Sequence, residues 1–346
     1  MKQTIIAIAM MALIVTGCGR RNAPEACHAE KNGVYYWKTV LKLDSADIAF
    51  MKRHEVGRVY LRMFDVDVED AEAVPVASVR IDDSAGKMPA PDDVEFVPVV
   101  YITVDALRMM AGKEKELAEN IVTRVRNMSE YNGLPNVAEL QLDCDWTTST
   151  EQSFFKLCDE SKNTIKELGL PWRLSSTIRL HQLSRKAPPV DCGVLMVYNT
   201  GSFNNPDTHN SIIDAADVEP YLKHLPSYPV HLDVAYPTYS WQLLFRGRIF
   251  AGLTDNVNLS DTANFTLRNG NRYVAKRDVP HKDIMIREGN TIREETAAYD
   301  ETARVKEMIE KQLAERGHSN ILYHLDNTNL SKYTSDEIDY IYTTGR

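Results

Sequence analysis

Two carboxylates, Asp143 and Asp145, are separated by one residue near the end of a strand-like segment of this chain. The segment Asn136–Trp146 alternates apolar and polar side chains with a period of two, which is typical of a strand with one apolar and one acidic face. Two carboxyl groups in unlike surroundings can perform general acid and base chemistry, because one stays protonated while the other is ionised. The spacing therefore predicts a reactive or ligand-binding site at this strand end.

The same alternation recurs on other candidate strands. Their polar faces carry Lys38, Arg62, Glu139, Arg179, His231, Asp233, His324 and Asp326. If helices cover the apolar faces, this polar set points inward, where charges must form a paired network or line a wet pocket. We predict catalytic roles for Asp143, Asp145, Asp233 and Asp326, which lie toward strand ends. Glu139 and His231 lie early in their strands, so a structural salt-bridge network is the alternative for them.

Eight segments have the length and residue content of strands. They are Val34–Val40, Arg58–Val66, Phe96–Val104, Val137–Trp146, Arg173–Leu180, Gly193–Gly201, Val230–Tyr236 and Asn320–Asp326. Since helical patterns separate most of them, we predict an α/β fold, a (β/α)8 barrel of the TIM type over residues 33–346. Barrel enzymes keep their chemistry at the carboxyl ends of the strands, which is where Asp143 and Asp145 fall.

The helices between these strands are predicted from apolar residues at helical spacing. They are Asp44–Val56, Lys113–Tyr131, Glu151–Leu168, Asp217–Leu225, Glu295–Arg316 and Ser335–Tyr342. No clear helix follows the second strand, where residues 68–93 are rich in Pro and Asp. After the seventh strand, Leu243–Leu253 and Arg272–Asp278 indicate added strands. We therefore expect an inserted hairpin or small subdomain at about residues 242–294.

The first residues indicate an export signal. Lys2 precedes an apolar run that is too short to span a bilayer, and Val15-Thr16-Gly17-Cys18 resembles the lipobox of bacterial lipoproteins. This predicts a signal peptide over residues 1–17, lipidation of Cys18, and a flexible tether over residues 18–32. An ordinary signal or a membrane anchor is the alternative. We expect the cell envelope as location, with the lipid as the only membrane attachment.

The composition limits the partners. With a formal net charge of −9, the chain is a poor candidate for nucleic acid or an anionic bilayer. The cysteines after the lipobox match no zinc pattern, so we predict neither a metal nor a cofactor. An oxidising compartment permits a disulfide, but we expect buried free thiols, because most of these cysteines lie on predicted core elements. They are Cys27, Cys144, Cys158 and Cys192.

The fourth predicted strand resembles a known signature. Leu142-Asp143-Cys144-Asp145-Trp146 is similar to the fourth-strand motif of family 18 glycoside hydrolases, the chitinase-like barrels. Met196-Val197-Tyr198-Asn199 is similar to their sixth-strand motif, which implies that Tyr198 and Asn199 hold a substrate's acetamido group. The chain departs from the family at the ends of the signature, where Leu140 replaces Asp and Thr147 replaces the Glu that acts as general acid. A threonine cannot protonate a leaving group as a carboxylic acid does.

A second resemblance covers more of the chain. The fourth strand, Tyr239-Ser240-Trp241 and Leu243-Leu244-Phe245-Arg246-Gly247 are similar to a group of bacterial lipoprotein barrels to which no activity is assigned. Three short motifs also resemble the O-glycosylation signal of Bacteroidetes. They are Asp44-Ser45-Ala46, Asp83-Ser84-Ala85 and Asp261-Thr262-Ala263. These resemblances imply a carbohydrate-active lipoprotein.

Three functions remain open. The first is a glycoside hydrolase acting on an unidentified glycan, with Asp145 paired with Asp326 or Asp233, and Asp143 below, influencing the charge of its neighbour. The second is a glycan-binding protein without catalysis, which the missing glutamate favours. The third is a structural surface protein. For the first two, we predict that the glycan contacts Arg179, Tyr198, Asn199, Tyr236, Tyr239 and Trp241.

Overall fold

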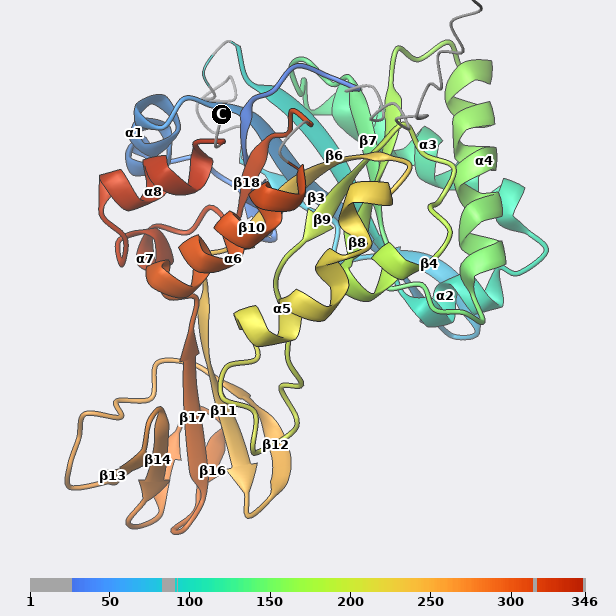
Figure 1. The fold of residues 1–346 in the computed structure, drawn as a ribbon. Helices are drawn as coiled ribbons and strands as arrows, with labels where there is room; N and C mark the ends of the chain where they lie inside the picture. The colour runs from blue at the N-terminus through green and yellow to red at the C-terminus, as the bar shows by residue number, and fades with distance from the viewer. Residues whose placement is uncertain (1–26, 83–90, 92, 314–315, 345–346) are drawn as a thin grey trace, which may run out of the picture.

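Eight parallel strands close into a barrel in this protein, whose computed structural model describes residues 27–82, 91, 93–313 and 316–344 (Figure 1). The ring follows chain order, and β1 closes it by pairing with both β3 and β18. The strands are β1 (Asn32–Tyr36), β3 (Val56–Glu69), β6 (Glu95–Ile102), β7 (Glu139–Asp143), β8 (Arg173–Arg179), β9 (Cys192–Met196), β10 (His231–Pro237) and β18 (Asn320–Tyr323). The predicted α/β fold of the TIM type is confirmed.

Helices cover the outside of the barrel. In Figure 1, α3 and α4 lie on one side, and α1, α6, α7 and α8 lie on the other. The helices are α1 (Ser45–Arg53), α2 (Val104–Met109), α3 (Glu114–Tyr131), α4 (Glu151–Glu167), α5 (Ala215–Leu222), α6 (Tyr299–Leu313), α7 (Asn327–Leu330) and α8 (Ser335–Tyr342). Short 3-10 turns occur at η1 (Leu180–Ser184) and η2 (Leu225–Ser227). Within the described residues, no helix combines the length and apolarity needed to cross a membrane.

The alternation on β7 explains how the barrel sorts its side chains. Leu140, Leu142 and Trp146 are fully buried in the outer core, and the indole of Trp146 stacks on Phe154 of α4, with 6.1 Å between ring centroids. Gln141, on the opposite face, accepts a hydrogen bond from the Tyr35 hydroxyl on β1, across the lumen (2.6 Å). A second cluster of buried side chains, which point inward from several strands, fills the middle of the barrel. The polar ends of the lumen are therefore separated from each other by packed side chains.

Several predicted boundaries differ from the structure. As the sequence indicated, the described residues between Val68 and Asp93 form no helix. They lengthen the sheet instead, because β3 runs on to Glu69 and pairs with β4 (Glu72–Val76), and β2 (Val40–Leu41) pairs with β5 (Arg80–Ile81). The predicted helix Glu295–Arg316 begins only at Tyr299, because Glu295 belongs to a strand that pairs with Trp241. Sequence periodicity alone does not show where such a strand partner lies.

The insertion after the seventh barrel strand is a sheet that projects from the barrel (Figure 1). Its strand order is β12-β11-β17-β14-β13. A small hairpin of β15 (Val279–His281) and β16 (Ile284–Ile286) comes between β14 and β17 in the chain. The strands are β11 (Ser240–Arg246), β12 (Ile249–Thr254), β13 (Phe265–Asn269), β14 (Arg272–Ala275) and β17 (Thr291–Thr296). Its strands β11 and β17 connect directly to the barrel, so the insertion can contribute side chains to the barrel mouth.

The predicted signal peptide and Cys18 lie outside the described residues. The described end of the predicted tether, residues 27–32, is attached to the barrel. Cys27 forms a disulfide with Cys192 at the start of β9, and the Lys31 amide donates to the Ser319 hydroxyl (3.2 Å). The expectation of free thiols is therefore wrong for this pair, while Cys144 and Cys158 are free and buried, as predicted.

Candidate functional site

Arg179 joins the two carboxylates at the carboxyl end of β7. Its Nη2 atom lies 3.1 Å from Oδ1 of Asp143, and its Nε donates to Oδ1 of Asp145. The Thr177 hydroxyl also donates to Oδ1 of Asp143 (2.6 Å). The Asp143 side chain is 4% exposed, whereas that of Asp145 is 49% exposed. Asp143 therefore lies below the pocket floor and Asp145 faces solvent.

The charges of this group are strongly coupled. Burial raises the pKa of Asp143, and the charge of Asp145 adds to that effect, while the guanidinium of Arg179 opposes it. Burial alone would lower the pKa of Arg179, but the carboxylates of Asp143 and Asp145 hold it well above its usual range. Arg179 is thus a permanent cation that neutralises one of its two partners. This leaves the group with a single negative charge when both carboxyls are ionised.

A row of aromatic rings crosses the barrel mouth next to this group. Tyr198, which follows β9, lies 4.5 Å from Tyr323 at the end of β18, measured between ring centroids. Tyr323 continues the row to Trp37 (5.7 Å), after β1. On the other side, Tyr239 and Trp241 are 5.5 Å apart. The sequence pattern had not indicated Trp37 or Tyr323, because single aromatic residues at strand ends carry no periodic signal.

Hydrogen bonds fix the orientation of these rings. The Tyr239 hydroxyl donates to Oδ1 of Asn199 (2.7 Å), and Asn199 has a φ of 53°, in the left-handed region that Asn tolerates. The Trp241 indole N–H donates to Oε2 of Glu295 on β17 (2.6 Å). Trp241 also packs against Phe203, with 6.3 Å between ring centroids. The inserted sheet therefore holds one end of the aromatic row in place.

These groups line a cavity of about 520 Å³. Its lining includes Asp145, Arg179, His181, Tyr198, Asn199, Ser202, Phe203, Asn204, Trp241 and Leu253. Such a volume suits a small ligand or part of an oligomer. Among the described residues that line this cavity, Asp145 is the only carboxylate. At position 147, Thr147 hydrogen-bonds its neighbour Ser149 (3.0 Å).

His181 is a site residue that the sequence analysis missed. It lies on η1 directly after β8 and lines the same cavity as Asp145. Burial lowers its pKa, against the opposing charge of Asp145, so that the imidazole is neutral near neutral pH. A single histidine after a strand is too common a pattern to identify by itself.

Three residues predicted for the site do not line the cavity, namely Asp233, Asp326 and Tyr236. Asp233 is the third residue of β10 and lies at the amino end of the barrel, where its Oδ1 accepts from the Ser319 amide (2.8 Å). Asp326 caps α7 and lies 3.9 Å from the ammonium of Lys38. The prediction that Asp233 pairs with Asp145 is wrong, because the two lie at opposite ends of the barrel. Asp326 is not among the residues that line the cavity.

Tyr236 is fully buried in the outer core, so the expectation that it contacts a ligand is also wrong. The reason is its position in the alternation, because Ala235 belongs to the inner core and Tyr236 therefore faces the helices. By contrast, the structure brings Asp143, Asp145 and Arg179 together with Tyr198, Asn199, Tyr239 and Trp241 at one end of the barrel.

Comparisons with known proteins place this fold. No family model matches the sequence, and no curated protein is similar to it. Among solved structures, the spore cortex-lytic enzyme SleL of Bacillus cereus matches with a TM-score of 0.54 and 12% identity, over 91% of this chain and 74% of the other. A catalytic domain of the Group II chitinase of Ostrinia furnacalis, in complex with penta-N-acetylchitooctaose, matches with a TM-score of 0.50 and 11% identity, over 90% and 95%.

A glycoside hydrolase family 18 N-acetylglucosaminidase from Paenibacillus barengoltzii has a TM-score of 0.48 at 12% identity, over 90% of this chain and 100% of the other. The reported neighbours with a TM-score of 0.50 or more are a spore cortex-lytic enzyme and a chitinase catalytic domain. At these identities the likeness shows a shared fold.

Proposed function

We propose that this protein binds a glycan at the barrel mouth without hydrolysing it. The observation that carries the proposal is the continuous row of aromatic rings beside a cavity with one carboxylate. Aromatic faces stack on the apolar faces of sugar rings, and the amide of Asn199 and the hydroxyls of the tyrosines offer hydrogen bonds. The fold shared with chitinase-like barrels supports N-acetylglucosamine oligomers as the first ligands to test.

The charge state of the mouth supports binding rather than two-carboxylate hydrolysis. General acid catalysis needs a protonated group that reaches the leaving oxygen. Asp145 is ion-paired with Arg179, Asp143 lies below the floor, and position 147 is a threonine. A neutral glycan also suits the site, because Arg179 has no positive charge left for an acidic sugar.

Calorimetric titration with N-acetylglucosamine oligomers of increasing length tests this proposal. We expect affinity to rise with length until the aromatic row is filled, and chromatography to recover the oligomer intact after long incubation. Absence of binding to any oligomer in the series, together with absence from a broad glycan array, would refute the proposal.

A hydrolase is the second candidate, and His181 is the observation that favours it. The imidazole shares the cavity with Asp145 and is neutral near neutral pH, so it is suited to exchange a proton with a substrate. In this case oligomers would be cleaved, and His181→Ala would abolish cleavage while leaving affinity within a few-fold. Intact oligomers after incubation with the wild type exclude this candidate.

We further propose that Cys18 is lipidated and attaches the protein to the cell envelope. The lipobox-like residues Val15–Cys18 support this, and so does the direction from which the chain enters the barrel. Cys27 is bonded to the amino end of β9, so the described chain begins at the end of the barrel opposite the mouth. Labelling with a radioactive fatty acid tests this, and Cys18→Ser should remove both label and membrane association.

A further inference from the structure

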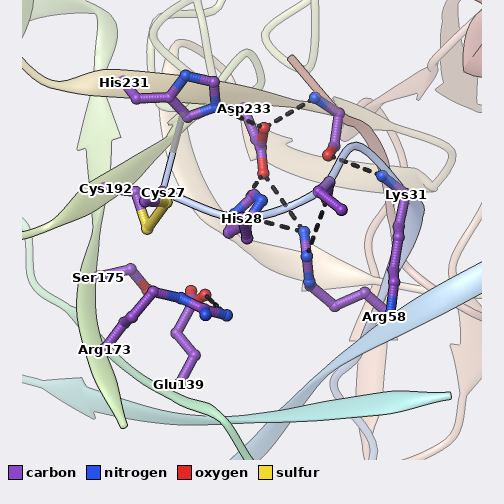
Figure 2. A network of polar contacts seen from close by, with 12 residues as sticks. Cys27, His28, Lys31, Arg58, Glu139, Arg173, Ser175, Cys192, His231 and Asp233 are labelled. Carbon is purple, nitrogen blue, oxygen red and sulfur yellow. Dashed lines mark hydrogen bonds and ion pairs between the residues drawn. A yellow bond between two sulfur atoms is a disulfide. The ribbon is translucent and has the colours of Figure 1, made fainter. Parts of the chain in front are cut away.

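A second cluster of chemically active groups lies at the amino end of the barrel, away from the cavity (Figure 2). Cys27, His28 and Cys192 each offer one ligand atom there, and these three atoms lie within 4.8 Å of one another. It is the one such group of three or more metal-ligand residues found among the described residues. Cys27 and Cys192 are separated by 165 positions, which is why no sequence spacing indicated the cluster.

The two ring nitrogens of His28 are in different surroundings. Nε2 lies 3.2 Å from Oδ2 of Asp233 and 3.4 Å from Nη1 of Arg58, whereas Nδ1 is buried and has no hydrogen-bond partner among the described residues. The His28 side chain is 5% exposed. In the tautomer that carries its proton on Nε2, facing Oδ2 of Asp233, the lone pair of Nδ1 is available to a cation. A carboxylate on one ring nitrogen and a free lone pair on the other is the arrangement in which proteins present histidine to a metal ion.

Asp233 is the carboxylate that lies next to Nε2 of His28, and its own position is fixed by several contacts. Its side chain is 1% exposed, and its Oδ2 lies 3.2 Å from Nε2 of His28 and 3.6 Å from Nη1 of Arg58. The Ser319 amide and the ring of His231 (3.3 Å) fix its other oxygen, Oδ1. Asp233 is thus an oriented carboxylate partner for His28, and a carboxylate in this position fixes the ring orientation of a histidine that binds a metal ion.

The surrounding charges are compatible with a cation. Arg58 is balanced by Glu95 (3.5 Å) and Asp233 (3.6 Å). Glu139 is fully buried in the same part of the lumen, and neither of its carboxylate oxygens has a hydrogen-bond partner among the described residues. Nη2 of Arg173 lies 3.7 Å from Oε2 of Glu139. A buried carboxylate without hydrogen bonds stabilises additional positive charge nearby.

We propose that Cys27, His28 and Cys192 form a redox-controlled site for a thiophilic divalent cation such as Zn²⁺. In the disulfide state the sulfur atoms are bonded to each other and the site is closed. A dithiol reductant opens it: the reductant gives two electrons and two protons to the sulfur–sulfur bond, becomes a disulfide itself, and leaves two thiols. The cation then binds both thiolates and Nδ1 of His28, and the two thiol protons pass to solvent.

The geometry suits zinc. Bonds of ~2.3 Å to sulfur and ~2.0 Å to nitrogen in a tetrahedron place ligand atoms roughly 3.5 Å apart, so the three atoms need only small movements. Cys27 and His28 belong to the short segment before β1, which can adjust once the disulfide is open. Cys27 is partly exposed, so that a water molecule can supply the fourth ligand.

The experiment compares oxidised and reduced wild-type protein. The purified protein is treated with dithiothreitol, freed of it by gel filtration under nitrogen, and titrated with Co²⁺ as a coloured substitute for Zn²⁺. We expect the reduced protein to bind one equivalent with thiolate-to-cobalt charge-transfer absorption, and Zn²⁺ to displace the Co²⁺. The oxidised protein should show no such absorption.

Variants identify the ligands. Cys192→Ser should lose the charge-transfer absorption, and His28→Ala should weaken binding at least about tenfold. Cys158→Ala is the matched control, because Cys158 is a buried free thiol on α4 and should leave the titration unchanged. The proposal is overturned if reduced wild type shows no absorption, if both redox states show the same absorption, or if Cys192→Ser retains it.

Discussion

Nη2 of Arg179 lies 3.1 Å from Oδ1 of Asp143, and both side chains are largely removed from water at the floor of the mouth. This contact opposes the effect of burial, which raises the pKa of Asp143, and it lies directly beneath the exposed Asp145. The guanidinium is also packed against Tyr198, whose ring centroid lies 5.9 Å from its central carbon. The floor of the candidate glycan site is thus an ion pair with little freedom to move.

Removing this arginine should destabilise the protein. In Arg179→Gln the Asp143 carboxylate loses its cation, and breaking a buried ion pair typically costs about 3 kcal/mol. We expect the loss in urea unfolding at neutral pH and a smaller loss in acid, where Asp143 is protonated. Arg248→Gln is the control, because its pair with Asp207 is exposed, and it should leave the midpoint unchanged. Equal effects of both substitutions would contradict this interpretation.

Trp241 should be a main contributor to glycan affinity. Trp241→Ala removes one end of the aromatic row, and we expect about a tenfold weaker binding of the best oligomer, which corresponds to ~1.4 kcal/mol. Leu267→Ala, on the exposed face of β13, should bind as the wild type does. Calorimetric titration of both variants measures the difference. If Trp241→Ala retains full affinity, the ligand does not use this end of the mouth.

Glu139 should make stability depend on pH. Burial raises its pKa above the ordinary value, against the opposing charges of His28, Arg58 and Arg173. A carboxyl with a raised folded pKa contributes its full stability below its unfolded pKa of about 4.3, and that contribution is lost as pH rises through the folded pKa.

Glu139→Gln cannot ionise and therefore should not lose this contribution. We expect the unfolding free energy of the variant, relative to wild type, to increase between about pH 4 and about pH 7. Urea unfolding of both proteins over this range tests the sign. A difference that stays constant or falls with rising pH would show that the neighbouring cations, rather than burial, dominate at Glu139.

The two free cysteines should resist alkylation. Cys144 and Cys158 are fully buried, and burial raises the pKa of both thiols, so little thiolate exists at neutral pH. Iodoacetamide should leave both unmodified in the native protein and modify both after unfolding in urea, as peptide mass spectrometry will show. Rapid native modification of Cys144 would mean that the β7–α4 packing opens readily.

The sequence by itself predicts the barrel strands and the inward-facing polar groups. Its period-two pattern on β7 separates Leu142 from Asp143, and this holds because neighbouring side chains on a strand must point to opposite faces. The same rule places Tyr236 on the helix-facing side of β10, together with Leu232 and Val234. The sequence could place Asp143, Asp145 and Arg179 at strand ends, because the type of a residue and the end of a strand are both local properties of the chain.

Only the tertiary structure decides which polar groups meet. Asp233 and Asp143 both lie on polar faces of barrel strands, yet one pairs with His28 at the amino end and the other with Arg179 at the carboxyl end. Likewise, Cys27 reaches Cys192 only because ring closure places the segment before β1 beside the start of β9. Periodicity fixes the face on which a side chain lies, but its depth and its partner depend on the register and closure of strands far apart in the chain.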